Sequence, residues 1–182
     1  MKFVIAALFS TFLLTANALT IDSITFDDKI TVDGKEMVLN GVGIRKATFL
    51  KIKVYYGALY LKSQTKNPND FLTTSDPKQV VMHFVRDVSA KDLISTYREA
   101  FEGANKENYK EFLPTLEQML THIKDIKKGE KTIFTFTTNG VRLLTAGTQA
   151  PLIGDQKFAE ALLKIWFINP IDKDLANGLL GK

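Results

Sequence analysis

The chain has 182 residues, a formal net charge of +4 and a hydrophobic fraction of 45%, a composition typical of a folded domain. It contains no cysteine, which excludes disulfides, thiolate nucleophiles and cysteine-ligated zinc or iron–sulfur centres. Acidic and basic residues are interspersed without a polybasic stripe, so nucleic-acid binding is not expected.

The first 18 residues have the pattern of a secretory signal peptide. Lys2 is followed by an apolar stretch that ends at Ala18 in an A-x-A-like cleavage site. A membrane anchor is the alternative, but Ser10 and Thr11 interrupt the apolar core, which falls short of the roughly 20 residues of a spanning helix. We predict cleavage after Ala18, a periplasmic or secreted location, and one domain over residues 19–182 without stable membrane insertion.

Short strands open this domain. Apolar and polar residues alternate over residues 19–39, where an Asp-Gly pair at 33–34 indicates a hairpin turn. The Gly-x-Gly at 41–43 is interpreted as a tight turn or bulge. Residues 50–61 predict a strand whose second half is apolar on both faces, which is typical of a central strand. Residues 79–88 predict a further strand.

Helical spacing then replaces strand alternation. Ser89 and Asp92 form a capping-box pattern at the start of a helix that ends near Gly103. Pro114 is expected to begin a separate helix. Residues 130–147 predict a β-hairpin, and the remaining residues are mostly helical, with Trp166 on an apolar stripe expected in the core. This order predicts an α+β fold, an antiparallel sheet with helices packed on one face.

Arg45 is the candidate site residue that composition does not explain. It precedes the most apolar strand of the chain, and its guanidinium keeps its proton at any accessible pH. If the side chain points inward, it must meet an anion or a hydrogen-bond network. If it lies at the edge of the strand, its methylenes cover apolar neighbours and its charge reaches water. The residues alone leave both readings open.

Two segments of the sequence resemble the bacterial exported branch of the chalcone isomerase-like family. They are "LNGVGIRKATFLKIKVYYGALYLK" at residues 39–62 and "TAGTQAPLIGDQKFAEALLKIWFINPIDKDLANGLLG" at residues 145–181. The resemblance covers nearly the whole mature chain in element order. It implies an open-faced β-sandwich, in which helices back a long antiparallel sheet and a ligand cleft lies between them.

The resemblance also implies site residues. In the plant enzymes, the motif arginine holds the phenolate of a chalcone during ring closure, and members without isomerase activity bind fatty acids. The arginine matches Arg45, and the family's threonine position falls on Tyr55. Leu93 and Ala100 stand where a tyrosine and an asparagine belong, so most of the catalytic polar network is replaced. We predict Arg45 and Tyr55 as ligand-binding residues, no catalytic residue, no metal and no cofactor.

Three functions follow from this pattern. The leading hypothesis is that the domain binds a small apolar anion, a fatty acid or a phenolic compound, without robust isomerase activity. The alternative is an intramolecular lyase or isomerase that acts on a chalcone-like conjugated ketone. The second alternative is an exported interaction module without a ligand, in which Arg45 pairs with a protein group. The sequence does not define the oligomeric state.

Overall fold

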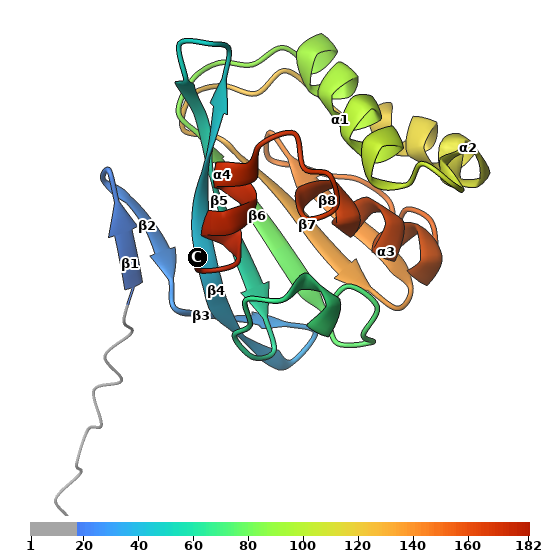
Figure 1. The fold of residues 1–182 in the computed structure, drawn as a ribbon, viewed down its shortest axis with the longest axis horizontal. Coiled ribbons are helices and arrows are strands. Elements are labelled where there is room, and N and C mark those ends of the chain that lie inside the picture. Colours follow the sequence, from blue (N-terminus) through green and yellow to red (C-terminus); the bar gives the residue numbers. More distant parts are fainter. Residues whose placement is uncertain (1–17) are drawn as a thin grey trace, which may run out of the picture.

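The computed structural model describes residues 18–182, which form a sheet covered by helices on one face (Figure 1). Seven strands pair antiparallel in the order β3-β4-β5-β6-β7-β8-β9. A separate two-stranded hairpin, β1–β2, precedes this sheet. The strands are β1 (Ala18–Ile21), β2 (Ile24–Asp27), β3 (Lys29–Val32), β4 (Lys35–Ala47), β5 (Ile52–Leu61), β6 (Lys78–Phe84), β7 (Lys131–Thr137), β8 (Gly140–Thr145) and β9 (Thr148–Gln149).

The helices confirm the α+β prediction. The α-helices are α1 (Ala90–Ala104), α2 (Tyr109–Leu120), α3 (Gln156–Leu163) and α4 (Lys173–Leu179), and the short 3-10 helices are η1 (Pro68–Asp70) and η2 (Lys164–Trp166). In Figure 1, α1, α3 and α4 lie over the same side of the main sheet, and the β1–β2 hairpin stands apart from them. The predicted signal peptide lies outside the described residues except for Ala18, the first residue of β1.

Strand β5 is central, as its apolar pattern predicts. Tyr55 and Leu59 belong to the core cluster beneath the helices. Tyr56 and Tyr60 belong to a second cluster on the opposite face of the sheet, which Phe26 of β2 helps to form. Successive side chains of β5 therefore point alternately into two buried clusters, which is expected of a central strand.

Of the two interpretations of the Gly-x-Gly at 41–43, the tight turn is wrong, and the bulge agrees with a shift in the pairing of β4 with β5 at Gly41. Both residues lie within β4, which continues to Ala47, although a register shift occurs between Leu39 and Gly41. A Cβ atom at Gly43 would lie 2.3 Å from the carbonyl oxygen of Leu175, and one at Gly41 would lie 2.3 Å from that of Gly178. These glycines therefore allow the backbone of α4 to pack directly on β4.

The expectation that Pro114 begins a helix is also wrong, because α2 continues through it from Tyr109 to Leu120. Proline cannot donate the hydrogen bond that a helix would direct to Lys110. Pro114 and Lys110 are both exposed, so water can reach the carbonyl that is left without a donor. The apolar side of α2, including Leu116 and Met119, remains buried.

Candidate functional site

Arg45 and Tyr55, the two predicted ligand-binding residues, lie opposite each other on neighbouring strands. Arg45 of β4 is the register partner of Tyr55 of β5. Arg45 shares its side of β4 with Gly43, which faces α4, and Tyr55 belongs to the core cluster beneath the helices. The structure therefore brings the pair together on the helix-covered face of the sheet.

The charge of Arg45 meets a carboxylate of the protein. Its Nη1 atom lies 3.3 Å from Oδ2 of Asp172 and also donates to the backbone carbonyl of Lys46. The side chains of Arg45 and Asp172 are 19% and 11% exposed, so the pair is largely shielded from water. Arg45 therefore points inward, and part of its guanidinium is hydrogen-bonded to Asp172 and to the backbone of Lys46.

Asp172 is positioned by the start of α4. Its Oδ1 atom accepts from the backbone N–H of Leu175 at 3.0 Å and caps the helix. Its Oδ2 atom accepts from the backbone N–H of Lys46 at 2.9 Å. Burial alone would raise the pKa of Asp172, but the two backbone hydrogen bonds and the Arg45 charge prevail and lower the pKa. The carboxylate is therefore ionised at neutral pH.

Tyr55 provides a protonated phenol beside this ion pair. Its side chain is 8% exposed, and burial raises its pKa to about 12, although the nearby Arg45 charge opposes the shift. A phenol with this pKa keeps its proton at neutral pH, so Tyr55 can donate a hydrogen bond. It can neither act as a general base nor supply a second charge there.

Two pockets meet at Arg45 and Tyr55. The first, here the Trp166 pocket, has a volume of about 40 Å³ and is lined also by Tyr97, Ala100 and Trp166. It has room for roughly one water molecule. The second, here the Arg86 pocket, has a volume of about 330 Å³, which lies at the small end of the roughly 300–1,000 Å³ range of ligand sites. Its lining residues are Arg45, Ala47, Thr48, Val54, Tyr55, Arg86, Asp87, Val88, Ser89, Asp92, Leu93 and Thr96.

Among the charged residues of the Arg86 pocket, the two aspartates have partners within the protein, whereas Arg86 forms no ion pair among the described residues. Asp87 pairs with Lys127 at 3.1 Å, and Asp92 accepts a hydrogen bond from Ser89 at 2.8 Å. None of the ion pairs formed among residues 18–182 includes Arg86. Arg86 thus lines the pocket without a carboxylate partner in the described part of the chain, beside Val54, Val88 and Leu93.

The interface between sheet and helices is filled by aromatic side chains. Trp166 is 4% exposed and confirms its expected place in the core. It packs edge-on against Phe134 with ring centroids 5.5 Å apart and against Phe136 at 6.1 Å. The resemblance implies a cleft at this interface, yet the larger space beside Arg45 lies at the edge of the interface, by the start of α1.

Sequence reasoning missed four contributors to the site. Asp172 contacts Arg45, which lies 127 positions earlier in the sequence. The only local signal at Asp172 is its position as the N-cap of a helix. Thr96 and Tyr97 line the pockets from α1, although their sequence context indicates only a helix face. Arg86 follows a buried strand, which is a signal that could have identified it. The Thr96 hydroxyl donates to the backbone carbonyl of Asp92 at 2.8 Å, and the Tyr97 hydroxyl contacts Sδ of Met82 at 3.7 Å.

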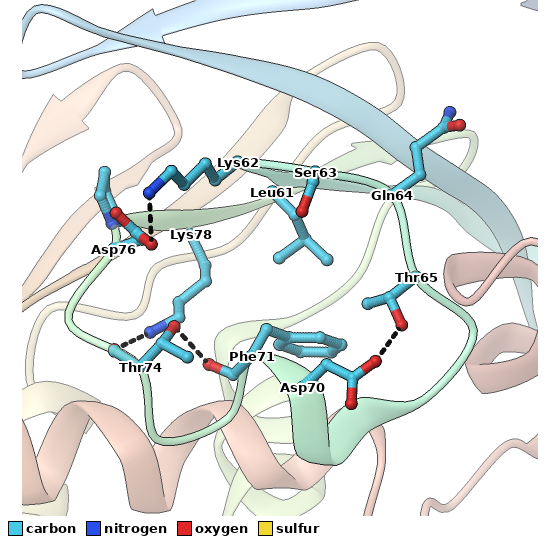
Figure 2. Close-up of a pocket in the computed structure, with 11 residues that line it drawn as sticks. Leu61, Lys62, Ser63, Gln64, Thr65, Asp70, Phe71, Thr74, Asp76 and Lys78 are labelled. Carbon is cyan, nitrogen blue, oxygen red and sulfur yellow. Dashed lines mark hydrogen bonds and ion pairs between the residues drawn. The ribbon is translucent and has the colours of Figure 1, made fainter.

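A polar pocket of about 210 Å³ lies at the other end of β5, around Lys78 (Figure 2). Lys78 is 5% exposed, and its ammonium donates to the backbone carbonyl of Thr74. Burial lowers the pKa of Lys78 to about 8, and the charges of Glu160 and Asp76 oppose this shift. Lys62 pairs with Asp76 at 3.3 Å on the rim. This pocket shares no lining residue with those beside Arg45.

No group of three or more His, Asp or Glu side chains in residues 18–182 could hold a metal ion. No helix of the described chain is long and apolar enough to cross a membrane.

Comparison with known proteins places the chain in a family. No protein of curated function matches its sequence. A crystal structure of a fatty-acid binding protein from Arabidopsis thaliana is similar in fold, with a TM-score of 0.72 and 14% sequence identity over 90% of this chain and 96% of that one. A family model described as chalcone isomerase-like matches residues 18–181. The match spans nearly the whole chain, so the protein belongs to the chalcone isomerase-like family.

Proposed function

We propose that the protein binds a small apolar anion in the Arg86 pocket and that a fatty acid represents this ligand class. The observation that carries the proposal is that two arginines, Arg45 and Arg86, line one pocket together with apolar residues, and that the acidic residues of this lining, Asp87 and Asp92, have hydrogen-bond partners of their own. The similar Arabidopsis protein is named a fatty-acid binding protein, which makes fatty acids the first ligands to test.

The bound carboxylate would lie between Arg45 and Arg86. Charge-assisted hydrogen bonds gain strength where a pocket excludes water, and the Tyr55 phenol can donate a further one. The hydrocarbon chain would contact Val54, Val88 and Leu93. Because the pocket volume is about 330 Å³, we infer a short ligand or a longer one whose end leaves the pocket.

We further propose that the domain acts outside the cytoplasm, as a member of an exported bacterial branch of the family. The support is the sequence pattern of residues 1–18, with its basic start, apolar core and small residues before Leu19. Residues 19–182 would then form the mature domain. Detection of a mature N-terminus at Leu19 in an exported fraction would support this assignment.

Titration with dodecanoate, followed by native mass spectrometry, tests ligand binding. We expect Arg45→Ala and Arg86→Ala each to weaken binding about 10- to 100-fold, because each removes a charge-assisted contact. The matched control is Arg142→Ala, since Arg142 pairs with Asp33 on the surface at 2.7 Å. Equal retention of dodecanoate by all three variants and wild type would contradict the proposal.

The Arg45–Asp172 ion pair favours a second candidate function, an interaction module in which Arg45 only joins β4 to α4. Under this candidate, Arg45→Ala would lower the free energy of unfolding, and Arg86→Ala would change neither stability nor dodecanoate binding. Arg86 therefore separates the two candidates, since its removal breaks no ion pair among residues 18–182.

A further inference from the structure

The turn between β4 and β5 exposes large apolar side chains that the fold does not use. Phe49 is 92% exposed, Leu50 65% and Ile52 40%. Single exposed apolar residues are ordinary on protein surfaces, but three within four positions form a patch. In Figure 1 this turn projects beyond the start of α4, at one end of the β4–β5 pair. This turn and its flanking residues, 46–53, form the tip.

The tip has a defined backbone. The N–H of Lys51 donates to the carbonyl of Thr48 at 3.1 Å and closes the turn. Thr48 and Lys51 both adopt left-handed backbone conformations, with φ of 63° and 51°. Residues other than glycine adopt this conformation at a cost in free energy. Folding therefore stabilises a conformation that presents Phe49 and Leu50 to the surroundings.

Three lysines lie close in sequence to these apolar side chains. Lys46, Lys51 and Lys53 all lie on the tip. Lys53 pairs with Asp22, and Lys46 lies 4.0 Å from Asp174, whereas none of the ion pairs among residues 18–182 includes Lys51. Apolar side chains that project between lysines match a bilayer surface, where acyl chains lie beneath anionic headgroups.

We propose that the tip docks the protein on anionic phospholipid bilayers, with Phe49 and Leu50 inserted among the acyl chains and the lysines at the headgroups. A protein partner or a second copy fits less well. Specific protein interfaces bury about 1,200–2,000 Å², which a single projecting turn cannot supply. Insertion into a bilayer needs only a few apolar side chains, because lipids adapt to their shape.

Docking would place the Arg86 pocket at the membrane surface. Ala47 and Thr48 of the tip line that pocket, so its mouth and the apolar patch belong to one end of the molecule. A fatty acid could then pass between bilayer and pocket without crossing bulk water. This transfer rests on the proposed ligand binding, whereas docking itself does not.

Co-sedimentation with vesicles tests the docking. The probes are phosphatidylcholine vesicles with and without phosphatidylglycerol. We expect wild type to bind the anionic vesicles, and the double variant Phe49→Ser/Leu50→Ser to bind at least about tenfold less, because the inserted apolar surface is lost. Lys51→Glu should weaken binding only to the anionic vesicles, and added salt should weaken the binding of wild type.

The control is Leu152→Ser, which removes another apolar side chain that is 51% exposed and should leave binding unchanged. Any vesicle binding through residues 1–17 would occur equally in wild type and all variants. Equal binding by the tip double variant and wild type would overturn the proposal. So would a dimer in size-exclusion chromatography that the double variant abolishes, if wild type does not bind vesicles.

Dodecanoate titration of the tip double variant separates this proposal from the proposed function. Phe49 and Leu50 do not line the pocket, so the variant should keep wild-type affinity for dodecanoate while it loses vesicle binding. If wild type binds vesicles but not dodecanoate, docking stands and ligand binding fails. If wild type binds dodecanoate but not vesicles, docking fails and ligand binding stands.

Discussion

Asp172 connects three parts of the molecule through one carboxylate. It caps α4, accepts from the backbone of β4 and pairs with Arg45. A helix N-cap needs only one of its oxygens, so the other oxygen is available to position Arg45. The negative charge also limits how strongly a ligand anion can attract the same guanidinium. Arg45 is thus held in place at some cost in affinity, and Arg86 supplies an additional positive charge.

Replacement of Asp172 by asparagine should destabilise the protein in a pH-dependent manner. The folded state lowers the pKa of Asp172 below its ordinary 3.8, so its contribution to stability is present above the unfolded pKa and is lost as pH falls through the folded pKa. We expect Asp172→Asn to lower the free energy of unfolding by about 1 to 2 kcal/mol at neutral pH. Urea unfolding of both proteins at neutral and acidic pH measures this.

The difference between wild type and Asp172→Asn should shrink as the pH is lowered towards the folded pKa. Asp174→Asn is the matched control, because the Asp174 side chain is 68% exposed and only 4.0 Å from Lys46. Exposed pairs of this kind contribute little. A loss of stability that is independent of pH in Asp172→Asn would contradict the assigned role of the charge.

Unlike Asp172, Lys78 lowers the free energy of unfolding at neutral pH, and this effect disappears at high pH. Its folded pKa is about 8, against an ordinary value of 10.5, so the folded state disfavours its charged form. Below pH about 8 both states bind the proton, and burial of the charge lowers the free energy of unfolding by its full amount. Between pH about 8 and 10.5 only the unfolded chain binds the proton, so the free energy of unfolding rises with pH until the cost has disappeared. Lys78→Met should therefore raise the free energy of unfolding at neutral pH, by on the order of 1 kcal/mol.

The gain from Lys78→Met should decrease as pH rises from about 8 to above 10. Urea unfolding at several pH values detects this change, and Lys62→Met on the rim of the same pocket is the control. The Lys62 side chain is 70% exposed, so its replacement should have no comparable effect. If Lys78→Met is equally destabilising at all pH values, the hydrogen bond to Thr74 outweighs the cost of burying the charge.

At the scale of elements, strand β4 holds helix α4 at both of its ends. Lys46 donates to Asp172 at the start of the helix. Near its end, the side-chain amide of Asn40 donates to the carbonyl of Leu179 at 2.7 Å. Between these contacts, Gly43 leaves no side chain between the two backbones. Strand and helix therefore act as one unit that fixes the position of Arg45.

Substitution of Gly43 tests this packing. A Cβ atom at this position would overlap backbone atoms of Leu175, which cannot rotate away as a side chain can. We expect Gly43→Ala to lower the free energy of unfolding by at least about 2 kcal/mol, as measured by urea unfolding.

Gly103→Ala is the matched control for Gly43→Ala, because a Cβ atom at Gly103 meets nothing within 4 Å. The residue lies in α1, so alanine should leave stability unchanged or raise it by up to about 1 kcal/mol. Similar effects of the two substitutions would show that close packing of α4 on β4 is unimportant.

At the scale of the whole molecule, the sequence predicts the antiparallel sheet, the cap of α1 at Ser89 and the burial of β5, because each depends on short-range patterns. The tight turn predicted at Gly41 and Gly43 is absent, because a glycine required by a helix far along the chain has the same local pattern as a turn residue. Arg45 was singled out as a charge beside an apolar strand, and Tyr55 was predicted through family resemblance. The pairing of Asp172 with Arg45 was not predicted, because it depends on a contact between residues 127 positions apart.

The pairing of β4 with α4 also affects the order in which the molecule can be completed. Arg45 is synthesised early, whereas Asp172 and the helix it caps are synthesised more than a hundred residues later. During synthesis, Arg45 has no partner in Asp172 until residues 172–179 have been made. Contacts between such distant residues form slowly, so we expect the docking of α4 on β4 to be a late step of folding that sets the final position of Arg45.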